Sequence, residues 1–227
     1  MKLQPQIMRD IWVSQKLSSV APGSLLLDAG CRSQRYRSFC NHLVYKVQDF
    51  EGYVGDSGHS IEKSVATSDN PYPYGLIDFK CDICSIPEVS ESFDVILCTE
   101  VFEHLHSPSL ALAELSRLLS PNGVLLLTVP CHTLRHMDPY HYFTGFTERW
   151  LEYHLPKNGL ELVELTPVMD YYSVQAMEIS RILSINGFLS IPFLLPAFFF
   201  LFSISPSPSS VSALPYGYHV MARRSHG

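Results

Sequence analysis

The stretch Leu25-Leu26-Leu27-Asp28-Ala29-Gly30 decides the fold class, because an apolar run that ends in Asp and Gly is typical of a buried strand followed by a tight turn. Similar short apolar runs recur along the chain, at Leu43–Asp49, Leu76–Asp82, Phe93–Thr99 and Val124–Val129. The segments between most of them are long enough for a helix. This alternation predicts an α/β fold with an open, mostly parallel sheet whose ligand binds at the carboxyl ends of the strands.

Helices are expected on either side of these strands. The apolar spacing predicts them over residues 5–19, 33–43, 107–120 and 147–155, and Pro121-Asn122-Gly123 is expected to end the third one sharply. Two further strands are predicted at Leu160–Leu165 and Tyr216–Arg223. Residues 51–75 are rich in Gly, Ser, Asp and Pro, which indicates a long loop.

The composition limits which partners the protein is expected to bind and where in the cell it is expected to be found. The formal net charge of −6 provides no basic field for a phosphate backbone, so we expect no nucleic-acid partner. The six cysteines are scattered, and the isolated pair Cys81 and Cys84 has no second pair to complete a zinc site, so neither a disulfide framework nor a metal is expected. Residues 1–20 carry no secretory signal, and a cytoplasmic location follows as an expectation.

The last fifth of the chain has a different composition. No Asp, Glu, Lys or Arg occurs between Ile185 and Val220, and Phe188–Ser205 is rich in Phe. We expect a single domain over residues 1–227 with a hydrophobic insertion at 168–213, before the last strand. A helical hairpin that covers the sheet, contact of Phe188–Ser205 with a membrane surface, a homodimer contact and a short membrane span are the alternatives.

Two positions indicate a nucleoside-bearing cofactor. Gly30 allows a tight turn that presents backbone N–H groups to a phosphate or carboxylate. Asp49 follows nineteen positions later, where an acidic side chain can bind ribose hydroxyls, and Asp56 is the rival for that role. These features alone would also fit a nicotinamide-dependent enzyme, although a complete G-x-G-x-x-G pattern is missing.

Longer motifs distinguish between these possibilities. Asp28-Ala29-Gly30-Cys31, the run from Phe93 through Glu103-His104-Leu105, and the run from Ala113 to Gly123 together resemble the class I S-adenosylmethionine-dependent methyltransferases of the type 11 group, over about residues 20–166. The resemblance implies a Rossmann-like sheet of seven strands with an antiparallel C-terminal strand and helices on both faces. It also implies S-adenosylmethionine as cofactor and methyl transfer to a small-molecule acceptor.

The resemblance further implies seven cofactor-binding positions at the strand ends: Asp28, Gly30, Asp49, Asp82, Ile83, Thr99 and Glu100. Asp28 and Gly30 are implied to lie beside the methionine part, and Asp49 to accept hydrogen bonds from both ribose hydroxyls. Asp82 and Ile83 are implied to flank the adenine, and Thr99 and Glu100 to lie next to the sulfonium.

One departure from the family pattern leaves a second hypothesis open. Arg32 and Gln34 occupy positions where further glycines are usual. The arginine could close the pocket, or its guanidinium could bind the carboxylate of the cofactor. A non-catalytic binding or scaffold protein that retains the fold is therefore the alternative to an enzyme.

The segment 132–147 is the densest group of chemically active side chains. His132, His136 and His141 follow the fifth strand, where a methyl acceptor would lie, and they are candidates for the general base or for orienting the acceptor. Their spacing has no register that would enforce metal geometry, so we predict no metal. The acceptor is expected to be a small molecule, with sugars and lipid-linked saccharides among the candidates.

Overall fold

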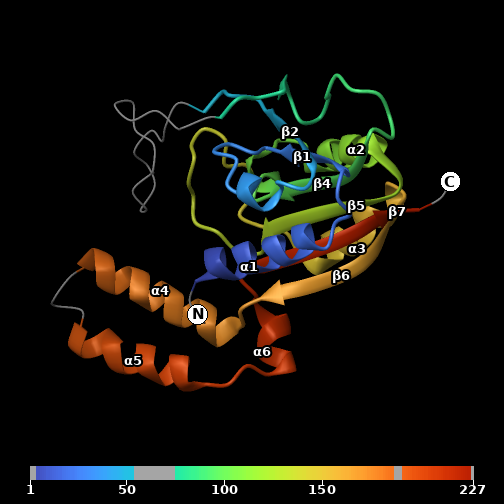
Figure 1. Cartoon of the computed structure of the whole chain (residues 1–227). Coiled ribbons are helices and arrows are strands. Elements are labelled where there is room, and N and C mark those ends of the chain that lie inside the picture. Colours follow the sequence, from blue (N-terminus) through green and yellow to red (C-terminus); the bar gives the residue numbers. More distant parts are fainter. Residues whose placement is uncertain (1–3, 54–74, 187–190, 226–227) are drawn as a thin grey trace.

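A computed structural model describes residues 4–53, 75–186 and 191–225 of the 227-residue chain. Seven strands form one sheet in the order β3-β2-β1-β4-β5-β7-β6 (Figure 1). The strand bounds are β1 Leu25–Ala29, β2 Val44–Asp49, β3 Phe79–Lys80, β4 Phe93–Thr99, β5 Leu119–Pro130, β6 Leu160–Val168 and β7 Gly217–Arg224. Strands β1 to β5 pair in parallel, and β7 lies antiparallel between β5 and β6. The predicted seven-stranded α/β sheet with an antiparallel C-terminal strand is confirmed.

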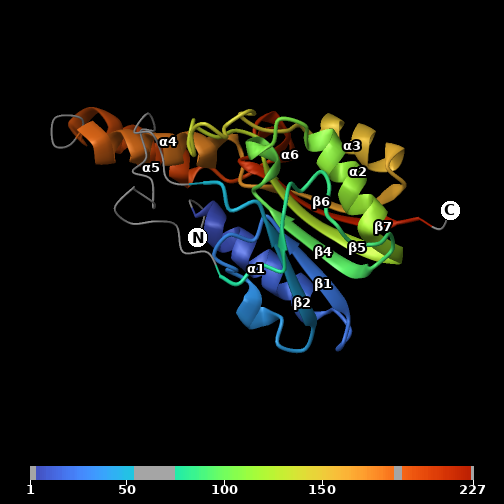
Figure 2. The same ribbon diagram turned by 90° about the horizontal axis from the view of Figure 1, so that it is seen from above.

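Helices cover both faces of this sheet (Figure 2). Helix α1 (Pro5–Ser18) buries Trp12, Val13 and Leu17 against one face, where Leu26 of β1 lies. Helices α2 (Pro108–Leu118) and α3 (Glu148–Lys157) pack on the opposite face, where Leu27 lies. Neighbouring strand residues point to opposite faces, so the continuous apolar run in β1 supplies both cores.

The prediction of a helix over residues 33–43 is wrong. The segment folds instead into successive turns and a single 3-10 turn, η1 (Arg37–Phe39). Arg32 and Gln34 have φ angles of 44° and 55°, which are incompatible with a right-handed helix. The side chains of Arg35 and Tyr36 bond the carboxylate of Asp10 on α1, which holds the turns against that helix.

Two other segments differ in extent from their predictions. The third strand is reduced to Phe79–Lys80, because the Asp78 side chain accepts the Val47 N–H that would otherwise extend the ladder at this sheet edge. Strand β5 begins at Leu119 rather than Val124, so Pro121-Asn122-Gly123 lies inside an irregular start of the strand. Most of the predicted 51–75 loop lies outside the described residues, as does Asp56.

The segment between β6 and β7 contains α4 (Tyr171–Asn186), α5 (Ile191–Ser203) and α6 (Pro208–Ala213). Helices α4 and α5 pack on each other and extend beyond the sheet in both views (Figures 1 and 2). Val174 and Ala176 of α4 are buried, whereas no residue of α5 is buried. None of the helices in the described part of the chain combines the length and hydropathy needed to span a bilayer.

Candidate cofactor and active site

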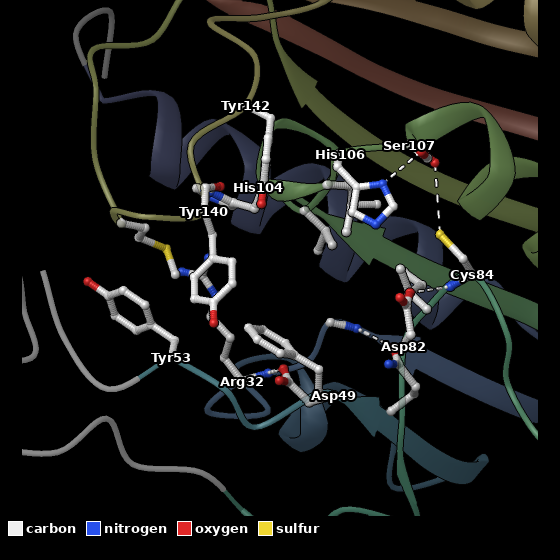
Figure 3. A pocket seen from close by; sticks show the side chains of 17 residues that line it. Arg32, Asp49, Tyr53, Asp82, Cys84, His104, His106, Ser107, Tyr140 and Tyr142 are labelled. Atoms are coloured by element: carbon white, nitrogen blue, oxygen red, sulfur yellow. Dashed lines mark hydrogen bonds between the residues drawn. The ribbon is translucent and has the colours of Figure 1, made fainter.

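A cavity of about 240 Å³ opens at the carboxyl ends of the parallel strands (Figure 3). Gly30 lies at the end of β1, Asp49 ends β2, Asp82 and Ile83 follow β3, and Val101 follows β4. The chain reverses its direction of winding between β1 and β4, and the crevice formed at such a point is where open α/β sheets bind ligands. Four of the seven predicted cofactor residues therefore line one cavity: Gly30, Asp49, Asp82 and Ile83.

The Asp49 carboxylate is fixed by two backbone donors. The N–H of Arg32 donates to Oδ2 at 3.0 Å, and the N–H of Glu51 donates to Oδ1 at 3.0 Å. Each carboxylate oxygen has a second lone pair. A ligand with two adjacent hydroxyls can therefore donate to both oxygens without breaking either backbone bond.

The turn after β1 keeps a glycine-like backbone despite its sequence. Gly30 has φ of 71°, and a Cβ there would lie 2.5 Å from Val101 Cγ2, so any side chain would clash. Arg32 and Gln34 also adopt left-handed φ angles, which glycine tolerates best. The backbone that the missing glycines would favour is thus present, and the Arg32 side chain lines the cavity beside Asp49 (Figure 3).

Asp82 and Ile83 form the wall of the cavity opposite the β1 turn. The Asp82 carboxylate is exposed, and its Oδ1 accepts the N–H of Cys84 at 2.8 Å. Ile83 is buried and presents an apolar surface. An acceptor of hydrogen bonds next to an apolar surface suits a flat heterocycle that carries an exocyclic amino group.

The other three predicted cofactor residues do not line the cavity. Asp28 is buried in β1, where it accepts a hydrogen bond from the Tyr45 hydroxyl, and desolvation raises its pKa to about 7. Glu100 forms an ion pair with Arg9, Nη1 to Oε2 3.0 Å, and accepts a hydrogen bond from Thr128 Oγ1 at 2.9 Å. Thr99 ends β4, paired in register with Thr128.

The loop after β5 brings two of the three candidate histidines together. The His136 ring lies 4.8 Å from the ring of His104 and 5.2 Å from that of His141, measured between centroids. His104 lies in η2 (Phe102–His104), next to Glu103. Neither His136 nor His141 lines the cavity, whereas His104 does. His132 lies apart from this group, and its backbone N–H donates to the Tyr216 carbonyl at 3.3 Å.

Burial sets the protonation of Glu103 and His104. Glu103 is 1% exposed, and desolvation, reinforced by the nearby charge of Glu100, raises its pKa to about 8. Desolvation, together with the positive charge of Arg32, lowers the pKa of His104 to about 2. His104 is therefore a neutral imidazole at physiological pH and a weak base.

The sequence placed the 132–147 loop, which contains Tyr140 and Tyr142, at the acceptor rim, but it did not indicate Phe50, Tyr53 or His106 as part of the cavity wall. Phe50, Tyr53, Tyr140, Tyr142 and His106 all line it, and Tyr140 packs edge-on against Phe50 with centroids 5.1 Å apart. The motif Glu103-His104-Leu105-His106, directly after the fourth strand, was the available signal for the histidines. Phe50 and Tyr53 carry no signal of their own, because a separate loop after β2 brings them to the cavity.

Comparisons with known proteins agree with this geometry. Residues 27–127 match the family described as "Methyltransferase domain", of the type 11 group. This segment includes the end of β1, all of β2 and β4, and the four predicted residues that line the cavity. Just under half of the chain therefore matches a methyltransferase domain, the family that the sequence motifs resemble. No curated protein matches the sequence.

Solved structures show the same fold at low identity. A putative methyltransferase from Bacillus halodurans aligns with a TM-score of 0.57 and 16% identity, over 96% of this chain and 100% of its own. The Burkholderia thailandensis 1,6-didemethyltoxoflavin-N1-methyltransferase, solved with bound 1,6-didemethyltoxoflavin and S-adenosylhomocysteine, aligns with a TM-score of 0.53 and 15% identity. The alignment covers 98% of this chain and 84% of that protein. The [4+2]-cyclase SpnF aligns with a TM-score of 0.55 and 16% identity, over 96% of this chain and 81% of its own. The same fold thus carries more than one kind of chemistry.

Proposed function

We propose that this protein binds S-adenosylmethionine in the cavity at the strand ends and transfers its methyl group to a small-molecule acceptor. The observation that carries the proposal is the Asp49 carboxylate, which lies on the cavity wall with lone pairs available for a vicinal diol. The β1 turn and the Asp82–Ile83 wall lie on either side of it, as a cofactor with methionine, ribose and adenine parts requires.

The residues present suit this cofactor. Asp49 would accept the ribose hydroxyls, Ile83 would pack on adenine, and Asp82 would accept from its amino group. Arg32 lines the same cavity and carries the positive charge that a methionine carboxylate needs. When bound, the cofactor supplies an electrophilic methyl group on a positively charged sulfur.

The protein's contribution is to place the acceptor and exclude water. Phe50, Tyr53, Tyr140 and Tyr142 enclose the cavity with aromatic surface and add phenol hydroxyls that can orient a polar acceptor. An in-line displacement at a sulfonium needs little covalent help, so holding the reacting atoms in line supplies most of the rate. A sugar or a lipid-linked saccharide suits a wall that combines ring faces with hydroxyls.

The candidate histidines act in this proposal mainly as positioning residues. His136 and His141 pack behind His104, and the loop that carries them also supplies Tyr140 and Tyr142 to the cavity wall. Direct proton abstraction by His132, His136 or His141 would require this loop to bring the ring into the cavity. Replacing His136 by Ala is expected to raise KM for the acceptor more than it lowers kcat.

The scaffold alternative is tested by catalysis itself. Formation of S-adenosylhomocysteine should be measured over a panel of sugar and lipid-linked acceptors with the parent protein, Asp49→Asn and Asp94→Asn. Asp94 accepts the Leu25 N–H at the opposite end of the sheet, so its variant also perturbs a carboxylate–backbone contact but not the cavity. Turnover that is lost in Asp49→Asn and kept in Asp94→Asn supports the proposal. Cofactor binding without turnover on any acceptor would favour a scaffold.

We also propose that α5 attaches the protein to a lipid surface. Phe193, Phe199 and Phe200 are 78%, 59% and 67% exposed, and α5 contains no charged residue. A helix that is apolar on all sides is normally covered by protein or lipid. Because α5 extends beyond the sheet, it can lie in the interfacial plane of a bilayer and leave the cavity accessible to a lipid-linked acceptor.

Lipid attachment is tested with the double variant Phe193→Asp/Phe200→Asp. Both side chains are exposed, so the melting temperature should stay near that of the parent while cosedimentation with neutral phosphatidylcholine vesicles is lost. Val89→Asp, at an exposed position away from α5, is the matched control and should still bind vesicles. A parent that fails to bind vesicles, or a double variant that only dissociates a dimer, would refute lipid attachment. The second outcome would assign the surface to another copy of the chain.

A further inference from the structure

A group of titratable side chains at the cavity wall combines donors from two separate elements. Glu103 and His104 come from η2 and His136 from the loop after β5, and one ligand atom from each lies within 4.8 Å of the others. The loop histidines alone have no register for a metal. Glu103 and His104 supply the missing ligands from a second element.

Both imidazoles have the orientation that metal ligands need. His104 Nδ1 lies 2.9 Å from the Tyr140 carbonyl, and His136 Nδ1 lies 2.9 Å from the Leu134 carbonyl. A carbonyl can only accept, so each Nδ1 carries the proton and each Nε2 keeps its lone pair. Metal-bound histidines show this pattern, with the remote ring nitrogen bonded to a carbonyl or carboxylate.

The distances also fit a metal better than a hydrogen bond. His104 Nε2 and Glu103 Oε1 are 3.6 Å apart, too far for a good hydrogen bond. Two ligands bound to one zinc ion at about 2.0 Å in tetrahedral geometry are roughly 3.3 Å apart. The three donor atoms lie within 4.8 Å of one another, so a shift of at most about 1.5 Å would bring the third donor to the same distance.

Unsatisfied polar atoms provide an independent sign of a missing ligand. Glu103 is almost completely buried, and its Oε2 has no hydrogen-bond partner among the residues that the structure describes. Within the same described ranges, both ring nitrogens of His141, next to His136, also lack a partner. Buried polar atoms of this kind normally bind a partner or an ion.

We propose that Glu103, His104 and His136 form a site for a divalent transition metal, with Zn²⁺ as the best fit. Two imidazoles and one carboxylate suit zinc, whereas Mg²⁺ and Ca²⁺ prefer oxygen-only ligand sets. The ion joins η2 to the loop that carries Tyr140 and Tyr142, and so fixes one wall of the cavity.

The metal site is tested without cofactor or acceptor, so its failure is separable from failure of the methyl-transfer proposal. Chelator-treated full-length protein is titrated with Zn²⁺ against a competing chromophoric chelator. The parent should bind about one equivalent and gain thermal stability. Glu103→Gln and His136→Ala should each weaken binding by at least about 100-fold, since loss of even an outer-shell partner costs 10–100-fold. His106→Ala, which removes an exposed histidine two residues from His104, should bind like the parent.

X-ray absorption spectroscopy at the zinc edge, recorded on the zinc-loaded parent protein, makes the test independent of how well the variants fold. The spectrum should show nitrogen and oxygen ligands with two imidazoles. No zinc binding by the parent, unchanged affinity in both folded variants, or a sulfur ligand would overturn the proposal. A sulfur ligand that disappears in Cys81→Ser/Cys84→Ser would assign the ion to that pair instead.

Discussion

The raised pKa of Asp28 predicts a pH dependence of stability that a single substitution can test. Its carboxyl is buried in β1, and desolvation raises its pKa from 3.8 to about 7, a change that the hydrogen bond from Tyr45 only partly offsets. The native state therefore binds more protons than the unfolded state between pH 4 and pH 7, so stability falls as pH rises through this window. A shift of about three units corresponds to about 4 kcal/mol.

The assay is denaturant unfolding of the parent and Asp28→Asn at several values between pH 4 and pH 8. The Asn amide can still accept the Tyr45 hydroxyl, and any cost of burying its NH₂ group does not depend on pH. Ionisable groups close to Asp28 are Tyr45, Asp49, Cys31, Cys40 and Cys98, and they are common to both proteins. The free energy of unfolding of the variant relative to the parent should rise by about 4 kcal/mol between pH 4 and pH 8. A difference that stays constant with pH would show that Asp28 is ionised normally in the native state and would refute this reasoning.

Two further substitutions test how the cavity is built. Gly30→Ala should destabilise the protein by more than Gly159→Ala, because both residues have φ near 70° but only a Cβ at Gly30 meets Val101, at 2.5 Å; the left-handed conformation alone costs about 1–2 kcal/mol. Thermal unfolding of both variants, and of Gly30→Ala combined with Val101→Ala, separates the cost of the left-handed backbone from the cost of the clash. An equal loss of stability in Gly30→Ala and Gly159→Ala would contradict the predicted clash. Glu100→Gln should lower stability by about 1–3 kcal/mol through its contacts with Arg9 and Thr128 while affinity for S-adenosylhomocysteine stays near that of the parent. A large loss of affinity for S-adenosylhomocysteine in a stable Glu100→Gln variant would show that Glu100 contributes to cofactor binding.

The sheet could be predicted because its strands are continuous apolar runs. Leu25–Ala29 and Phe93–Thr99 are buried on both faces, so their sequence pattern is independent of the loops around them. The segment 33–43 could not be predicted in the same way. Its apolar residues have helical spacing, but the turn imposes left-handed angles on Arg32 and Gln34, and Asp10 of a distant helix holds Arg35 and Tyr36. Tertiary contacts of this kind leave no local signal.

The same distinction applies to the site. Gly30, Asp49, Asp82 and Ile83 could be placed together because parallel strands bring their carboxyl ends to one edge of the sheet. The group of Glu103, His104 and His136 depends on how a long loop folds back over η2, which no periodicity encodes. Glu103 could equally have been a solvated helix charge, and its burial emerges only from the structure.

Calorimetric titration with S-adenosylmethionine is the most direct test of the proposed function. The parent should bind, and Asp49→Asn should weaken binding by about ten- to a hundredfold, because loss of one charge-assisted hydrogen bond to the ribose is worth about 1.5–3 kcal/mol. Asp94→Asn, with its carboxylate at the far end of the sheet, should retain the parent affinity. No heat and no thermal shift at millimolar cofactor, or equal affinity in a folded Asp49→Asn variant, would contradict the proposed cofactor site.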